Sequence, residues 1–487
     1  MFDEILAAAS RGSGGGATSA AEVEELMKAL EASGPLSNVG LTGGAALRVQ
    51  SLDKTMQATI VENKHFVLFG RLAKPEVSGI VDEWVEQKGV GGFLGGSTNT
   101  EAGAARAAVG DYARRHGSVK FLSTRRQVSL AAKIQQGIAS AEGVEQAGGA
   151  KQLLSDAEYL CWEGDEAVVP TEFSGIFSQM QEGVRRGGVD PDNIVDLDGA
   201  AMTSFDPLAQ AAAQIGSRDN FGTPTDLFLS PFAQADLDAS LAPAYRVGLS
   251  PSGSDIALGA PVSAIRTSDG VIATSQDKFI RDQQHMTPFE VQYPKVAAKN
   301  LGMKPTLAIA EPEVDVESRF RVNRAGTYYY GVAGVSAEGQ SPMVVSGAIA
   351  IGAGEAPVLT ITRSAGQEET GYVIYRSRQD GTNAPADMRE MCRIPASGLA
   401  TTVFKDQNRK LPGATKAAML NMLKSDTAII WRQFLPMMKF KLYPTDSPVD
   451  PWLQLLWGYL RISKLRQHVV LINIVPRSAK WRPHKGE

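Results

Sequence analysis

The sequence has little cysteine and little histidine, the side chains that most often build disulfide frameworks and metal centres. Only two of its 487 residues are cysteine, Cys161 and Cys392, and their wide separation fits two buried thiols in a reducing compartment better than a disulfide scaffold. The histidines lack the spacing of three or four residues, to one another or to a cysteine, that a zinc site requires. They are His65, His116, His285, His468 and His484. The sequence therefore indicates no metal site.

The motifs of phosphate binding and of nucleophilic catalysis are also missing. Five glycines stand between residues 89 and 96, but no Lys-Ser or Lys-Thr follows them. We interpret this stretch as a loop tip whose glycines relieve backbone strain, not as a phosphate cradle. The G-x-S-x-G pattern of serine hydrolases is absent. We therefore expect no catalytic residue, no cofactor and no enzymatic activity.

One acidic run could in principle bind a cation, because hard cations prefer oxygen ligands. It consists of Asp190, Asp192, Asp196 and Asp198. We favour the alternative of a solvated turn region, in which aspartate side chains cap backbone N–H groups.

No strong excess of one charge is present. The 49 basic and 53 acidic residues give a formal net charge of -4, so the chain as a whole has no electrostatic attraction to a polyanion. Basic residues gather near the end of the chain, at Lys464, Arg466, Arg477, Lys480, Arg482 and Lys485. This segment indicates either a weak, sequence-independent contact with DNA phosphates or a solubilising tail.

Long uninterrupted apolar runs are absent too. The most apolar late stretch, residues 452–475, is broken by Arg461, Lys464 and Arg466, which a membrane-spanning helix tolerates poorly. The first residues include Asp3 and Glu4 and show no basic segment followed by an apolar core. We therefore expect neither a membrane span nor a secretory signal.

What the sequence does contain is a globular composition, with 43% hydrophobic and 21% charged residues, in a chain long enough for roughly three domains. Residues 1–75 combine a helical pattern at Glu22–Ala32 with glycine-rich flanks, which predicts an extended arm, with an unordered terminus as the alternative. Strand-like patterns at 76–87 and 118–131 flank a linker of small residues. Together they predict an outstretched hairpin over residues 76–130.

The middle of the chain alternates between helical and strand-like patterns. Apolar residues at spacings of three and four predict a long helix over residues 139–163. Strand patterns at 193–197 and 223–229 alternate with helical patterns at 207–215 and 231–241. This alternation indicates an α+β domain.

Residues 305–413, here called the β module, change to an alternation of aromatic and β-branched residues. Thr327–Val335 and Tyr372–Arg376 are its clearest examples, and they predict an all-β sandwich. The patterns after it are helical at 415–423 and strand-like at 437–443 and 468–475. We therefore expect the β module to be inserted into a host fold that continues after it.

Several stretches, taken in their order along the chain, carry a family resemblance. They are EYLCWEGD (Glu158–Asp165), NFGTPTDLFLSPFAQADL (Asn220–Leu237), RVGLSPSGSDIALGAPVSAIRTSDGVIATSQDKFI (Arg246–Ile280), and WRQFLPMMKFKLYPT and HVVLINIVP within Trp431–Pro476. Together with the arm, the hairpin and the long helix, they resemble the major capsid proteins of tailed bacteriophages with the Hong Kong 97 fold. In the β module, GTYYYGVAGVSAEGQSP and GYVIYRSRQDG resemble immunoglobulin-like or fibronectin type III domains.

The resemblance implies an α+β capsid fold with the family's parts in sequence order. These are an N-terminal arm (1–75), an E-loop hairpin (76–130), a P domain with a spine helix (131–200, with about 461–487), an A domain (201–304, with about 414–460) and the inserted immunoglobulin-like β module (305–413). It also implies a structural protein of the virion whose copies form the hexamers and pentamers of an icosahedral shell.

The same resemblance implies partners. The shell would enclose double-stranded DNA and contact it weakly and non-specifically, with portal, scaffolding and decoration proteins as further partners and no membrane. We expect Trp84, Phe93 and Leu94 of the hairpin to contact a neighbouring subunit.

Two other functions stay open at this point. An encapsulin-like cage holding an enzyme cargo would have the same fold, and a surface adhesin could be built around the β module, although adhesins usually repeat such a module. An enzyme with an unrecognised active site offers no residue cluster to argue from.

Overall fold

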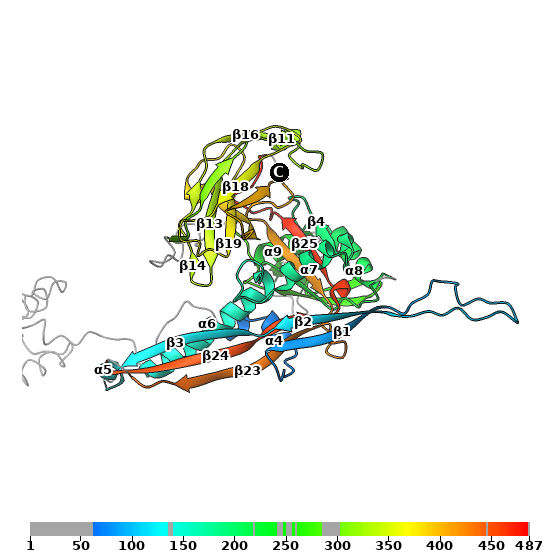
Figure 1. Ribbon diagram of the computed structural model, residues 1–487, viewed down its shortest axis with the longest axis horizontal. Coiled ribbons are helices and arrows are strands. Elements are labelled where there is room, and N and C mark those ends of the chain that lie inside the picture. The colour runs from blue at the N-terminus through cyan, green and yellow to red at the C-terminus, as the bar shows by residue number, and fades with distance from the viewer. Residues whose placement is uncertain are drawn as a thin grey trace, which may run out of the picture. The chain divides into compact units, whose positions relative to one another are not determined.

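The computed structural model describes residues 62–134, 140–217, 220–240, 261–284, 302–444 and 447–485, together with the paired short strands β6 (Val247–Leu249) and β7 (Ile256–Leu258). These residues belong to one contact unit, Ile60–Gln136 with Ser140–Glu487. Helices and sheets mix within it, as the α+β expectation requires (Figure 1). The predicted helix at Glu22–Ala32 lies outside the described residues.

A long helix, α6 (Ala141–Glu163), confirms the helix predicted at 139–163. The Ser140 side chain begins it by accepting a hydrogen bond from the N–H of Gly143 at 3.3 Å. At 1.5 Å per residue the helix is about 35 Å long. Its buried residues concentrate toward its C-terminal end, at Leu153, Ala157, Glu158, Leu160, Cys161 and Trp162. They share a core with α4 (Leu68–Arg71) and α7 (Ile176–Arg185), a helix that the sequence patterns did not predict.

Helix α6 lies along one face of a three-stranded antiparallel sheet (Figure 1). The strand order is β23 (Ile429–Lys441), β24 (Val449–Ile462) and β3 (Lys120–Ser129). Leu122 of β3 and Leu456 of β24 pack into the core that α6 shares. Strand β24 was not predicted, because apolar side chains stand on both of its faces and hide the period-two alternation.

The hairpin differs from its prediction in its second strand. Strand β1 (Val81–Gly89) pairs with β2 (Asp111–Ser118), a segment that the pattern had placed in the linker. The predicted partner, 118–131, contains β3, which pairs with β24 instead. Strand β2 has few apolar residues because most of it is exposed, so it gives no strand signal.

A second sheet of six strands runs in the order β4, β25, β22, β5, β9, β8. Their bounds are Ile194–Asp196, Val469–Ile474, Thr415–Leu420, Asp226–Leu229, Gly270–Gln276 and Ala264–Thr267. Helices α8 (Asp206–Gly216) and α9 (Pro231–Ser240) contribute buried residues to one of its cores. The predicted helix at 415–423 is wrong: this segment is β22, paired on both sides by β5 and β25.

The two sheets change the expected grouping of the later segments. Of residues 414–460, which were expected with 201–304, β22 pairs with β5 of that range, whereas β23 and β24 pack with β3 and α6. Residues 461–487 were expected with 131–200, and β25 pairs with β4 of that range on one side and with β22 on the other. Hydrogen bonding between distant strands decides this grouping, and periodicity within a segment carries no information on it.

The β module is built mainly from two sheets. One has the order β10 (Thr306–Ile309), β18 (Val358–Thr362), β21 (Thr401–Lys405). The other has the order β14 (Gly339–Gln340), β13 (Tyr330–Ser336), β19 (Gly371–Ser377), β20 (Met388–Pro395), with β15 (Val344–Val345) also on β13. Two further strand pairs, β11 (Glu313–Val314) with β17 (Glu355–Ala356) and β12 (Gly326–Tyr328) with β16 (Ile349–Ile351), complete the module. Side chains from both main sheets form one core, including Ile361, Tyr372 and Ile374.

The basic segment near the end of the chain is folded against the β module. Trp481 and His484 are 5% and 2% exposed. The indole N–H of Trp481 donates to Asp387, and the Tyr328 hydroxyl lies 3.2 Å from Nδ1 of His484. A free solubilising tail is therefore the wrong interpretation for residues 476–485.

Candidate functional site

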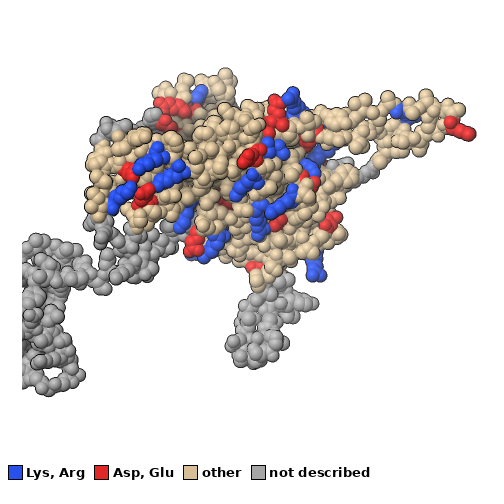
Figure 2. All heavy atoms as spheres, turned by 90° about the horizontal axis from the view of Figure 1, so that it is seen from below, with Lys and Arg blue, Asp and Glu red and all other residues tan. Residues whose placement is uncertain are grey.

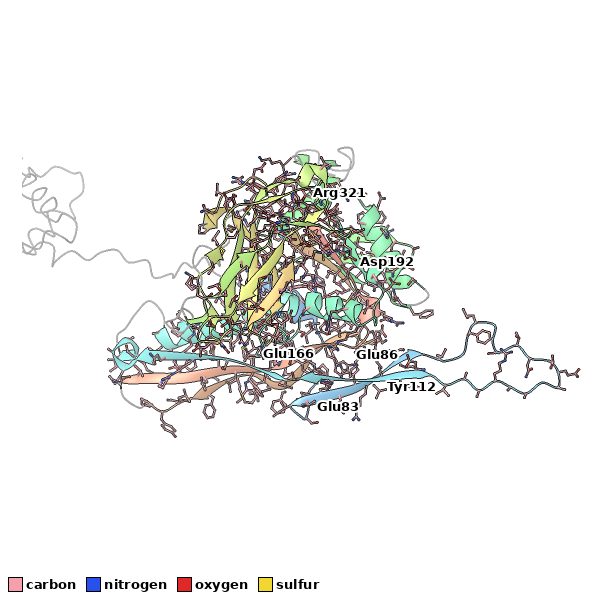
Figure 3. The ribbon with its side chains drawn as sticks, turned by 45° about the horizontal axis from the view of Figure 1, so that its top comes forward. Glu83, Glu86, Tyr112, Glu166, Asp192 and Arg321 are labelled. Carbon is pink, nitrogen blue, oxygen red and sulfur yellow. The ribbon has the colours of Figure 1, made fainter. Side chains whose placement is uncertain are left out.

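The β1–β2 hairpin presents one face to solvent. Alternate residues of β1 and their β2 partners make up this outer face, with Val81, Val85 and Tyr112 exposed by 58%, 68% and 61%. An ion pair between Glu83 and Arg114 crosses it. Figure 3 shows Glu83 and Tyr112 along the hairpin. An exposed face of apolar side chains around one ion pair, on a two-stranded ribbon, is suited to contact another surface.

The inner face of the hairpin is held by its own subunit. Asp82 accepts hydrogen bonds from the Tyr459 hydroxyl at 2.7 Å and from Arg432 Nε at 2.8 Å, and Arg461 also lies within ion-pair distance. Burial alone would raise the pKa of Asp82, but these hydrogen bonds and positive charges outweigh it and hold the pKa below its usual value. At Gly117 an added Cβ would lie 2.3 Å from the Tyr459 ring, so the hairpin root packs directly on that ring.

The three residues expected at the subunit contact divide into two groups. Trp84 is half-buried on the inner face, with the Arg461 guanidinium 5.3 Å from its ring, and its indole N–H has no hydrogen-bond partner among the described residues. Phe93 and Leu94 lie beyond β1 in the hairpin tip and are 66% and 76% exposed. The tip therefore offers apolar side chains to solvent, whereas much of Trp84 is turned toward its own subunit.

A second exposed apolar surface covers the side of the three-stranded sheet that faces away from α6. Directly paired residues share a face of a sheet, and three cross-strand rows of this outer sheet face follow from the register. They are Phe121–Trp457–Leu435, Ser123–Leu455–Met438 and Arg125–Leu453–Phe440. Phe121, Met438 and Phe440 are exposed, and Phe121 meets the Trp457 ring edge-on at 5.0 Å. Sequence reasoning missed this surface because it joins three segments far apart in the chain.

The hairpin root and the outer sheet face belong to one continuous side of the sheet. Tyr459 and Arg461 follow Trp457 on β24 at alternate positions, so they point to the same side. The chain's own hairpin packs on Tyr459 and Arg461, whereas Phe121, Met438 and Phe440 in the rows from Trp457 onward are exposed. In the view from below, uncharged surface predominates, and basic and acidic side chains lie beside one another (Figure 2). One end of this side is thus already covered by a hairpin, and the other is bare.

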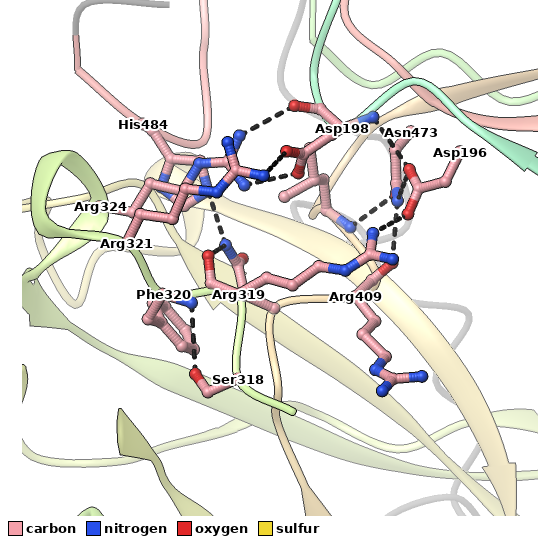
Figure 4. A network of polar contacts seen from close by, with 12 residues as sticks. Asp196, Asp198, Ser318, Arg319, Phe320, Arg321, Arg324, Arg409, Asn473 and His484 are labelled. Atoms are coloured by element: carbon pink, nitrogen blue, oxygen red, sulfur yellow. Dashed lines mark hydrogen bonds and ion pairs between the residues drawn. The ribbon is translucent and has the colours of Figure 1, made fainter. Parts of the chain in front are cut away.

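The acidic run at 190–198 has a structural role. Asp190 and Asp196 each cap a backbone N–H two residues on, at 2.9 Å, as the turn interpretation predicted. Asp196 also pairs with Arg319, and Asp198 accepts from Arg324 Nη1 at 2.6 Å and pairs with Arg321 at 3.0 Å (Figure 4). These arginines belong to the β module, so the run fastens the module to the six-stranded sheet.

A second ionic cluster lies at the end of α6, where it meets the β module. Lys416 donates to Glu163 at 2.7 Å, and Arg281 and Arg393 pair with Glu390. Burial would raise the pKa of Glu163, but the charges of Lys416 and Arg281 outweigh it and lower the pKa to about 2. These side chains line a cavity of about 90 Å³. Opposite charges are paired around it, so it resembles a buried structural junction.

The described ranges contain neither a metal-binding cluster nor a membrane-spanning helix. No group of three or more His, Cys, Asp or Glu side chains there could hold a metal ion. No helix in that part of the chain is long and apolar enough to cross a membrane.

The comparisons with known proteins find likeness only to solved structures. No protein-family model matches the chain, and no curated protein matches it. An encapsulin complex from Synechococcus elongatus is 9% identical, with 91% of this chain and 98% of that chain covered and a TM-score of 0.40. The capsid of a native GTA particle is 8% identical, with 90% and 99% covered and a TM-score of 0.46. The structure of Phage G major capsid and decoration proteins is 7% identical, with 90% of this chain and 100% of that chain covered and a TM-score of 0.41. Over about nine-tenths of its length the chain is thus similar to capsid and encapsulin shell proteins.

Proposed function

We propose that this chain is a major capsid protein, whose copies form hexamers and pentamers in an icosahedral head shell around double-stranded DNA. The observation that carries the proposal is the pair of exposed apolar surfaces, the hairpin with its tip and the outer sheet face. Monomeric proteins rarely leave large contiguous apolar surface exposed. A subunit with one projecting and one receiving surface makes head-to-tail contacts, which close into rings.

The hairpin of one copy lies on the outer sheet face of the next in this proposal. The subunit's own hairpin root already shows that a ribbon packs on this side of the sheet, with Gly117 against Tyr459. Phe93 and Leu94 make the new contacts at the tip, and Trp84 contributes the accessible part of its ring. Many modest contacts of this kind, each made simultaneously by every copy, sum to a stable shell.

The parts of the fold take these roles. The hairpin of β1 and β2 is the E-loop, while most of the arm expected at residues 1–75 lies outside the described residues. The P domain consists of α6 with the three-stranded sheet, and the A domain consists of the six-stranded sheet with its helices. The β module, 305–413, is an immunoglobulin-like insertion on the outside of the shell, where decoration or portal proteins bind. The two facing sheets with a shared core support this assignment of the module.

Assembly of tip variants tests the proposal. The matched pair is Phe93→Ser with Leu94→Ser in the tip, against Val314→Ser with Val316→Ser in the β module, where the side chains are even more exposed, at 82% and 100%. We expect the tip variant to fold with an unchanged melting temperature but to sediment as small species, without closed shells in negative-stain micrographs. The β-module variant should form shells. Normal shells from the tip variant would refute the proposal.

An encapsulin-like cage is the second candidate, and one observation favours it. Three of the six basic residues that suggested DNA contact are engaged within the subunit: Lys464 with Asp426, Arg466 with the Gly188 carbonyl and Lys485 with Asp380. Nuclease treatment of purified shells separates the two candidates. Protected DNA supports the head shell, and a co-purified protein cargo without DNA supports the cage.

A further inference from the structure

A buried pair of carboxyl groups lies under the segment that leads into the hairpin. Glu158 on α6 and Asp277, directly after β9, are both 0% exposed, and they lie close enough for the charge of Asp277 to raise the pKa of Glu158. Neither belongs to the contact surfaces described above. Two neighbouring carboxylates that are both buried cannot both be ionised at modest cost, so the pair retains a proton.

Glu158 holds the segment 66–72 through its backbone. Its two carboxyl oxygens accept hydrogen bonds from the N–H of Leu68 at 2.7 Å and of Phe69 at 2.8 Å. Leu68 is fully buried, and the Phe69 ring meets Trp431 edge-on at 5.1 Å. The segment therefore closes over the carboxyl pair and keeps water away from it.

Asp277 is fixed to the framework on its other side. It accepts hydrogen bonds from the Trp162 indole N–H at 2.9 Å and from the Phe279 N–H at 2.8 Å, and its own N–H donates to the Leu229 carbonyl. The chain segment that leads into the hairpin forms backbone hydrogen bonds with β23 only from Ala73 onward. The segment 66–72 is thus the part that can move when the pair becomes charged.

Few charges face the pair. The Lys74 amino group lies 4.2 Å from the Phe69 ring centre and attracts the Glu158 carboxylate, and the Cys161 thiol, whose pKa burial raises, stands on the same helix. Further out, Arg71 is bound to Asp226, and Lys278 lies beside His65. Lys74 is partly buried and lies across a ring, so it does not neutralise the pair.

We propose that the Glu158–Asp277 pair is a proton-controlled latch on the segment 66–72, at the root of the hairpin. With the shared proton bound, the segment lies closed on α6. Loss of the proton places two like charges in the core, and the segment lifts so that water reaches them. The latch concerns a single chain, so its failure would leave the proposed shell function standing.

The sign of the pH dependence follows from the closed state. Burial, and next the charge of Asp277, raise the pKa of Glu158 from its usual 4.5 to about 8. The closed form therefore binds one more proton than the lifted form between these two values. The closed form therefore loses stability as the pH rises through this window. The equilibrium constant for opening rises by up to about tenfold per pH unit within the window and is constant above it.

Hydrogen exchange of the full-length protein tests the latch. Exchange of peptides covering residues 66–72 is measured from about pH 5 to about pH 9 and corrected for the base-catalysed intrinsic rate, so that opening alone remains. We expect the opening equilibrium to rise across this range in the unmodified protein. In Glu158→Gln, whose amide replaces the protonated carboxyl, and in Asp277→Asn, which removes the second charge, the rise should disappear.

Glu172→Gln is the matched control. Burial also raises the pKa of Glu172, which accepts from the Asp165 N–H and not from segment 66–72, so this variant should keep the rise. Opening that is independent of pH in the unmodified protein would overturn the proposal, as would a rise that persists in both latch variants. Two substitutions at different elements keep the test decisive if one of them fails to fold.

Discussion

The Tyr459 hydroxyl donates a 2.7 Å hydrogen bond to Oδ2 of Asp82, which joins the root of the hairpin to the central strand of the three-stranded sheet. Burial, and then the contact with Asp82, raise the pKa of Tyr459 well above its usual value. Besides this hydroxyl, Asp82 binds two guanidinium groups through ion pairs, those of Arg432 and Arg461. One carboxylate on β1 is therefore bound to side chains of both β23 and β24.

Asp82→Ala should loosen the hairpin because it leaves two cations and a hydroxyl without their acceptor, a loss of about 1–3 kcal/mol. Tyr459→Phe removes one hydrogen bond and should cost about 1 kcal/mol. Urea denaturation and hydrogen exchange of residues 81–89 measure the two effects. Equal exchange in Asp82→Ala and the unmodified protein would show that the strands alone hold the hairpin.

Met438→Ser with Phe440→Ser should prevent assembly while leaving the subunit folded, because both side chains are exposed on the outer sheet face and removing them exposes no core. Val403→Ser, on the exposed surface of β21, is the control and should assemble normally. Sedimentation velocity distinguishes shells from small species. Shells from the double variant would show that this face is not a subunit contact.

Arg376→Met should destabilise the β module by about 3–5 kcal/mol, because Arg376 is fully buried and pairs with Asp406 at 2.6 Å, and its removal leaves a buried charge unpaired. The same substitution at Arg409, whose ion pair with Glu317 is exposed, should lower the free energy of unfolding by less than about 1 kcal/mol. Thermal unfolding of both variants makes the comparison. Similar melting temperatures would mean that water reaches Asp406 in the variant.

His468 should make the six-stranded sheet sensitive to acid. Its ring is fully buried, and burial lowers its pKa from 6.5 to about 4. The folded state therefore binds fewer protons than the unfolded state between these values, and stability present above pH 6.5 is lost as the pH falls toward 4. The loss is about 1.4 kcal/mol per pH unit within this window.

Urea denaturation at several pH values, compared with His468→Asn, isolates this contribution. The asparagine side chain retains an acceptor for the Asn421 N–H, which His468 Nδ1 now accepts at 3.3 Å, but it does not titrate. Parallel pH profiles of the two proteins would contradict the assignment.

The elements that the sequence predicted well are those whose own periodicity is strong. Helix α6 has apolar residues at helical spacing, and β13 and β19 consist of aromatic and β-branched residues. Strand β22 was mistaken for a helix because Lys416, Ala417, Ala418, Met419 and Leu420 are all good helix formers. Its pairing with β5 and β25 overrides that preference.

The exposed apolar surfaces were only partly predictable for a related reason. Phe93 and Leu94 stand among small and polar residues, so their exposure could be read from the local sequence. The outer sheet face depends on which strands pair, and Trp84 turns toward Arg461 only because β1 pairs with β2 in one register. Surfaces made by distant strands have no signature in any single segment.

The junction between β2 and β3 has a mechanical consequence. Strand β2 ends at Ser118 and β3 begins at Lys120, so only Val119, 2% exposed, separates the hairpin from the sheet. Because no flexible loop separates the two strands, a force applied to the hairpin tip along β2 is transmitted directly to β3. There it loads the ladder between β3 and β24, from Lys120 to Ser129, in shear, so that many hydrogen bonds share the load and do not break one by one. The hairpin is thus suited to bear tension, because it is anchored in the sheet on which α6 packs.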